Sequence, residues 1–174
     1  MVEREAQRTR EAEARDDPFY QWGFAQSDLW LERANEGQVV IKGQDVPWRQ
    51  GRQGRLKWLL HPLQQDQALS GWLFFIQDIK THSGRHRHQG GLAIHVIEGQ
   101  GWTTVDGVRH DWEEGDLILL PLRPKGVEHQ HFNANPGSPC KWLAMIYTHF
   151  YEAVCCEHEQ KEVSPDWGHQ YSVT

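Results

Sequence analysis

Cysteine is scarce in this sequence, which has only Cys140, Cys155 and Cys156. An odd number of cysteines, two of them adjacent, cannot supply the paired framework of a disulfide-stapled secreted domain. The first residues, from Val2 to Ala6, are mostly charged and lack the apolar core of a signal peptide. We therefore expect a protein of the reducing cytoplasm, in which Cys155 and Cys156 are chemically inert.

Long apolar runs and an excess of basic residues are also missing. No stretch approaches the roughly 20 apolar residues that a membrane-spanning helix needs. The net charge is -6 and the isoelectric point is about 6.0, so neither a nucleic acid nor a membrane is expected as a partner. The 174 residues show no internal repeat and 38% of them are hydrophobic, which predicts one domain with extensions.

Short β-like runs separated by turn signals begin at Gln38. Asp106 and Gly107, between Val105 and Val108, are typical of a two-residue hairpin turn. Nine tryptophans and 16 glycines suit aromatic packing and tight turns. Many short strands without helical periodicity between them predict an all-β sandwich or barrel. The expected strands are residues 38–42, 55–61, 72–79, 84–88, 92–98, 102–105, 108–111, 116–120, 127–133 and 141–147.

The pattern divides the chain into three parts. Residues 1–35 are predicted to be an N-terminal extension, and residues 1–17 within it lack an apolar stripe and are expected to be disordered. Ser27 is expected to cap a short helix that ends at Gly37. The predicted barrel covers residues 36–152, and residues 153–174 are predicted to be a polar, irregular tail.

Histidines cluster in two of the predicted strands. Alternate side chains of a strand share a face, so His86 and His88 project together, and His129 projects with His131 and Asn133. A lone histidine is more often a surface or core residue than a ligand. Two alternating pairs on separate strands instead favour a metal site, because histidine is the commonest metal ligand.

These two stretches resemble the two motifs of the cupin superfamily. In the first motif, His86 and His88 fill a His-x-His pattern and Gly99 stands at the closing glycine. The second motif is matched by residues 115–121 and then, after a three-residue insertion, by Pro124, Gly126, His129 and Asn133. The resemblance covers roughly residues 50 to 150. It implies a single small jelly-roll barrel of the cupin type, with an N-terminal extension.

Leu92 occupies the position where the first motif often has glutamate. Leucine cannot bind a metal, so the resemblance implies three histidine ligands, His86, His88 and His129, and no carboxylate. This set is similar to that of gentisate dioxygenases and of small three-histidine iron cupins that cleave carbon–carbon bonds. Three neutral imidazoles leave the full charge on the ion, which favours an anionic bidentate substrate with open positions for that substrate and O₂.

Strand parity selects further candidates beside the metal. His131 is the candidate catalytic acid or base. The alternative is that His131 and Asn133 only fix the loop and orient a ligand ring. Leu92, Ile94 and Val96 are expected to line the pocket, whereas His95 faces outward. Aromatic residues on strands are mostly core, but Trp102 and Tyr147 are candidates to flank the substrate.

The expected function is that of an Fe(II)-dependent dioxygenase that cleaves a C–C bond of a small aromatic, dicarbonyl or hydroxyketone compound. Zinc, nickel and manganese remain alternatives to iron, since three histidines and a water also form a catalytic zinc site. Two other functions stay open. One is an O₂-independent lyase, isomerase or decarboxylase, and the other is non-catalytic binding of a small ligand. A homodimer or higher homo-oligomer is expected, with the aromatic segment from Phe19 to Leu31 packing on the barrel or on a second subunit.

Overall fold

The computed structural model describes residues 17–64 and 66–167. The expected disorder of the N-terminus therefore concerns residues that lie, apart from Asp17, outside the described ranges. The chain separates into two compact units. One comprises the N-terminal segment up to Val39 together with the short segment that ends at Leu69, and the other begins at Val40 and holds the rest of the chain. Neither helix described below is long and apolar enough to cross a membrane, within the described residues.

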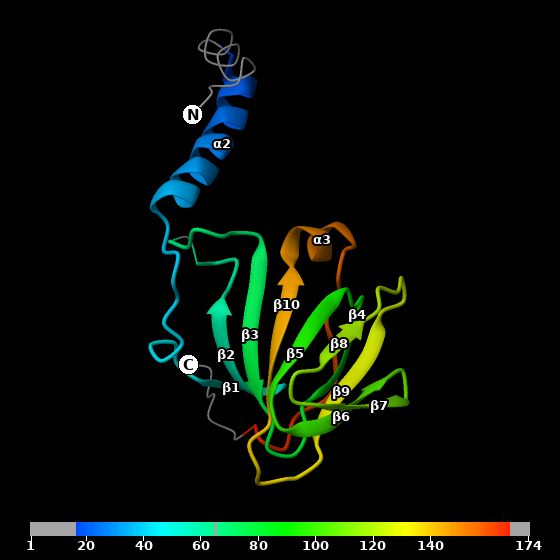
Figure 1. The fold of residues 1–174 in the computed structure, drawn as a ribbon. Helices are drawn as coiled ribbons and strands as arrows, with labels where there is room; N and C mark the ends of the chain where they lie inside the picture. Colours follow the sequence, from blue (N-terminus) through cyan, green and yellow to red (C-terminus); the bar gives the residue numbers. More distant parts are fainter. Residues whose placement is uncertain (1–16, 65, 168–174) are drawn as a thin grey trace, which may run out of the picture. The chain divides into compact units, whose positions relative to one another are not determined.

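The first unit is built on helix α2, Pro18–Glu36 (Figure 1). The Asp17 carboxylate accepts a hydrogen bond from the Phe19 amide at 2.9 Å, and proline at the first helical position needs no such partner. The helix ends at Gly37, as predicted. The predicted start at Ser27 is wrong, because the stronger cap lies ten residues earlier and Ser27 falls inside the helix.

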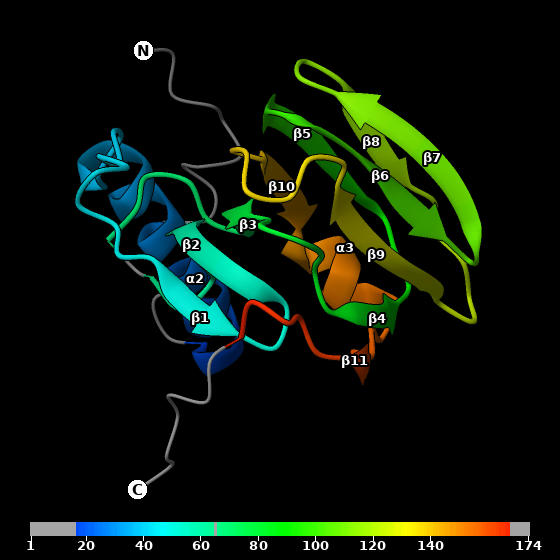
Figure 2. The ribbon, with the colours of Figure 1, turned by 90° about the horizontal axis from the view of Figure 1, so that it is seen from below.

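The second unit is an all-β barrel, as predicted. Its described residues form a six-stranded sheet of order β1-β2-β3-β10-β5-β8 and a five-stranded sheet of order β11-β4-β9-β6-β7, all paired antiparallel. Figures 1 and 2 show these strands, which together make a jelly-roll barrel of two sheets. The strands are β1 Arg49–Gly51, β2 Gly54–Leu60, β3 Trp72–Asp78, β4 Arg85–His88, β5 Leu92–Glu98, β6 Gln100–Val105, β7 Val108–Glu113, β8 Leu117–Leu120, β9 Val127–Asn133, β10 Lys141–Tyr147 and β11 Glu159–Glu162.

Alternation along the strands places the hydrophobic core between the sheets. On β5, Leu92, Ile94 and Val96 are buried, whereas His95 between them is exposed, as predicted. On β10, the alternating residues Trp142, Ala144 and Ile146 belong to the same hydrophobic core. Asp106 and Gly107 both have positive φ, and they connect β6 to β7 in the expected hairpin.

Two local expectations are wrong. Residues 39–42 form no strand, since only Gln38 makes an isolated bridge, to Gln67. Residues 153–174 are not an irregular tail throughout, because residues 159–162 form β11, which pairs with β4 (Figure 2). The short helix α3, Thr148–Ala153, lies between β10 and β11 in the chain.

Candidate metal centre

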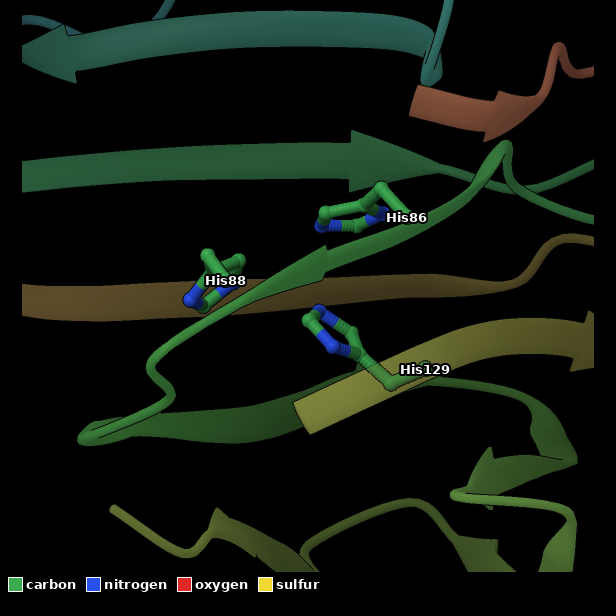
Figure 3. Close-up of side chains that lie close together, drawn as sticks. All are labelled: His86, His88 and His129. Carbon is green, nitrogen blue, oxygen red and sulfur yellow. The ribbon is translucent and has the colours of Figure 1, made fainter. Parts of the chain in front are cut away.

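The three predicted metal ligands come together on neighbouring strands of one sheet. β4 and β9 pair antiparallel with His86 directly opposite His129, and His88 lies two residues further on the same face of β4. Ring nitrogens of His86, His88 and His129 all lie within 4.8 Å of one another. Figure 3 shows the three rings pointing toward one another. The shared register of two antiparallel strands therefore assembles the cluster.

Hydrogen bonds to the backbone orient two of the rings for metal binding. Nδ1 of His86 lies 3.2 Å from the Gly84 carbonyl oxygen, and Nδ1 of His129 lies 3.1 Å from that of Val127. A carbonyl only accepts, so Nδ1 of each ring carries the proton and Nε2 is left free for a metal ion. His88 differs, because its Nδ1 accepts from the Gly90 amide at 3.0 Å. That bond must give way if His88 binds an ion through Nε2.

Burial keeps these imidazoles neutral. Desolvation lowers the pKa of His86 and of His129 well below the ordinary value for histidine, and neighbouring imidazoles lower it further. Desolvation, followed by the proximity of His158, lowers the pKa of His88 to about 4. A metal ion can bind only a deprotonated ring nitrogen, so at neutral pH the three rings already have the neutral charge that ligation requires. The donor set therefore fits a divalent transition metal.

The cluster opens into a cavity of about 350 Å³ between the two sheets. Leu92 and Ile94 on β5 form part of its wall, as predicted, and so does Trp142 on β10. Val96 was also expected there, but it is packed in the hydrophobic core instead. Leu92 faces the cavity at the position where the cupin motif often has a glutamate, and no aspartate or glutamate is among the described residues that line it. The available ligands are therefore imidazoles alone.

His131 lies deeper in the same wall and is only 1% exposed. Its Nδ1 is 2.8 Å from the Thr103 hydroxyl, which also accepts a hydrogen bond from the Trp112 indole N–H at 2.9 Å. The ring packs against Trp142, with centroids 4.8 Å apart. Complete burial lowers the pKa of His131 to about 3, so it is a neutral imidazole at physiological pH.

Three other candidates lie outside the cavity. Asn133 is buried and holds the loop after β9, because its side-chain amide donates to the Ile79 and Ser138 carbonyls and its oxygen accepts from the Asn135 amide. The expectation that Trp102 and Tyr147 flank the substrate is wrong for the described cavity.

Strand parity explains why both aromatic residues miss the cavity. Gly101 and Thr103 point inward on β6, so Trp102 faces outward, where it stacks on Phe132 with an interplanar angle of 7°. Tyr147 is 46% exposed at the end of β10, because Ile146 takes the inward position there.

Sequence reasoning missed several residues that do line the cavity, and His158 is the most consequential. Its ring stacks on that of His86, with centroids 4.8 Å apart and an interplanar angle of 14°. Nε2 of His158 is 3.3 Å from the side-chain nitrogen of Gln53, which donates to Gln160. Tyr151 of α3 also lines the cavity, with its ring 5.9 Å from that of His88. The segment after the predicted barrel thus contributes to the site.

Comparison with known proteins agrees with the fold. Residues 74–146 match the family model of the cupin domain. Gentisate 1,2-dioxygenase from Ralstonia sp is 33% identical over 88 residues, which are 48% of this chain and 24% of that protein. The chain therefore matches about a quarter of the length of this curated relative.

Solved structures share the fold at low sequence identity. The polyketide cyclase RemF from Streptomyces resistomycificus superposes with a TM-score of 0.53 at 15% identity, over 74% of this chain and 89% of that chain. Salicylate 1,2-dioxygenase from Pseudoaminobacter salicylatoxidans, in adducts with gentisate, gives a TM-score of 0.51 at 12% identity, over 80% of this chain and 36% of that chain. These likenesses establish a common barrel.

Proposed function

We propose that this protein is a dioxygenase that binds Fe(II) and cleaves a C–C bond of a small aromatic, dicarbonyl or hydroxyketone compound with O₂. One observation carries the proposal. His86, His88 and His129 converge, as neutral imidazoles and without a carboxylate, on an apolar cavity large enough for a small molecule. The partial match to a gentisate dioxygenase supports the same reaction class.

Each part of the site has a definite task in this proposal. His86, His88 and His129 hold the ion, which when bound would supply charge stabilisation and bring two substrate oxygens and O₂ together. Leu92 and Ile94 exclude water from the cavity and leave the ligand set uncharged. His131, held by Thr103, is placed to hydrogen-bond a substrate oxygen as a neutral ring.

Metal analysis and oxygen consumption test the proposal. Protein purified without oxygen should hold about one iron per chain, since one three-histidine group is present in the described residues. His129→Ala should lose the metal, whereas the control His110→Ala on exposed β7 should retain it. Stoichiometric zinc combined with no oxygen consumption on any phenol or diketone would refute an oxygenase.

The same donor set suits zinc, nickel or manganese acting as a Lewis acid. Turnover that proceeds without O₂ and with any of these ions would favour a lyase, isomerase or decarboxylase instead. Ligand binding without any turnover would favour a binding protein.

We also propose that the chain forms a homodimer, or a higher homo-oligomer, through α2 in the cytoplasm. Phe19 and Trp22 of this helix are 76% and 67% exposed, so a partner subunit would remove apolar surface from water. The unpaired cysteines suit a reducing compartment. Deleting residues 1–35 should give a monomer by light scattering, and an unchanged dimer would reject this role.

A further inference from the structure

The cavity beside the three histidines carries no formal charge of its own. Among the described residues that line it, none is a lysine, arginine, aspartate or glutamate. Its wall is mostly aliphatic and aromatic, and its remaining polar side chains are two glutamines, a threonine, a tyrosine and five histidines: Gln53, Gln77, Thr148, Tyr151, His86, His88, His129, His131 and His158. Apart from a bound metal ion, the cavity therefore contains no cation that could pair with a negatively charged group of a ligand.

The cations on neighbouring strands are already engaged away from the cavity. Arg85 and Arg87 alternate with the ligands on β4 and both contact the Glu128 carboxylate, at 3.0 Å and 3.6 Å. Arg55 on β2 pairs with Asp78 at 2.8 Å. None of these three arginines lines the cavity. A substrate carboxylate beyond reach of the ion would thus lose its hydration without gaining an ionic partner, which is strongly unfavourable.

Gln53 marks where a polar substituent can be accommodated instead. Its side-chain nitrogen is engaged with Gln160 and His158, but its Oε1 atom is buried without a hydrogen-bond partner among the described residues. A buried acceptor without a partner is costly, so a ligand that donates a hydrogen bond there is favoured. A neutral hydroxyl or amide can make that bond, whereas a carboxylate, which only accepts, cannot.

We propose that this site takes a substrate whose only charged atoms are the oxygens that bind the metal, and whose remaining part is apolar and uncharged. Gln53 is the residue that sets this selectivity at the cavity wall. The inference rests on the proposed function for the presence of a metal-binding substrate, and it excludes compounds that carry a carboxylate on the part remote from the ion.

A matched pair of chelating diketones tests the selectivity by binding alone. Benzoylacetone and para-carboxybenzoylacetone present the same two oxygens to an ion and differ only in a remote carboxylate. Calorimetry on the zinc-loaded protein without oxygen should give a Kd for the neutral probe at least about 30-fold lower than for the charged probe. Equal affinities, tighter binding of the charged probe or no binding of either probe would overturn the proposal.

A positive charge introduced at position 53 provides a second test of the selectivity. Gln53→Lys should raise the affinity for the carboxylate probe relative to the neutral probe by at least about tenfold. The matched control is Gln50→Lys, which adds the same charge to exposed β1. If both variants change the relative affinity for the two probes equally, the effect is due to net charge, and the proposed role of Gln53 is wrong. Selective binding without oxygen consumption would refute the dioxygenase but retain this selectivity.

Discussion

The Thr103 hydroxyl should be a large contributor to stability for its size. Thr103 is 0% exposed on β6, and its single oxygen serves both the Trp112 indole N–H and Nδ1 of His131. Thr103→Val keeps the shape of the side chain but removes the oxygen. The indole N–H and the ring nitrogen would then both be buried without a partner.

The magnitude follows from these two orphaned groups. Each buried polar group that loses its partner costs about 1–3 kcal/mol, and the added methyl recovers part of this, so we expect a loss of about 3 kcal/mol in the free energy of unfolding. For a chain of this size, that loss corresponds to a fall in Tm of roughly 6–12 °C. Urea denaturation of the metal-free protein measures the difference directly.

Thr104→Val is the matched control for Thr103→Val. Thr104 is the next residue on β6 and is only partly buried on the opposite face, so its replacement should change stability by less than about 0.5 kcal/mol. Metal content should stay unchanged in both variants, because Thr103 contacts no proposed ligand. A Thr103→Val protein as stable as the Thr104→Val protein would refute the idea that this hydroxyl supports His131.

Three further predictions concern the same region. Gly90→Ala should lower the free energy of unfolding by about 3 kcal/mol or more, because Gly90 has φ +82° and an added Cβ would lie 2.0 Å from the Pro121 carbonyl oxygen. The control Gly107→Ala, with φ +83° and open space around the added Cβ, should lower it by only about 1 kcal/mol in the same urea denaturation assay. Zinc at about a thousandfold its Kd should raise the free energy of unfolding by about 4 kcal/mol, and a His129→Ala protein whose Tm still rises with zinc would contradict the ligand assignment. The metal-free protein should lose stability as the pH falls below about 6.5, where unfolded histidines take up protons that the folded state excludes. A folded pKa of about 3 for His131 makes its share about 2 kcal/mol at pH 5, and His131→Gln should flatten that dependence.

The sequence was sufficient to place most of the strands and to select the three clustered histidines. β5 and β9 run over the same residues as predicted, because alternation of buried and exposed side chains is a local property. His86 and His129 also required a register between distant strands, which spacing within one strand does not contain. The cupin motifs supplied that register, so their resemblance added information that periodicity alone lacks.

Where local patterns misled, a neighbour in space decided the outcome. Val39 and Val40 have strand-forming side chains, yet they are 83% and 58% exposed and lie in none of the described strands. Trp102 was expected near the substrate on account of its aromatic ring. On β6 the inward positions belong to Gly101 and Thr103, so the indole stacks on the outer face beneath the Arg109 guanidinium, 4.1 Å from the ring centroid.

His158 shows why the sequence did not predict the residues at the edge of the site. The segment around it is polar, and β11 has almost no apolar alternation, so no periodic signal predicts a strand there. The segment is held instead by backbone pairing with β4, where Gln160 lies opposite His86, and by contacts such as the bond from the Glu157 amide to the Gln89 side chain. Backbone pairing of this kind needs no particular side chains and becomes visible only once both strands are placed. Because this pairing brings the His158 imidazole against the ring of His86, a proposed metal ligand, residues on both sides of position 152 line the same cavity.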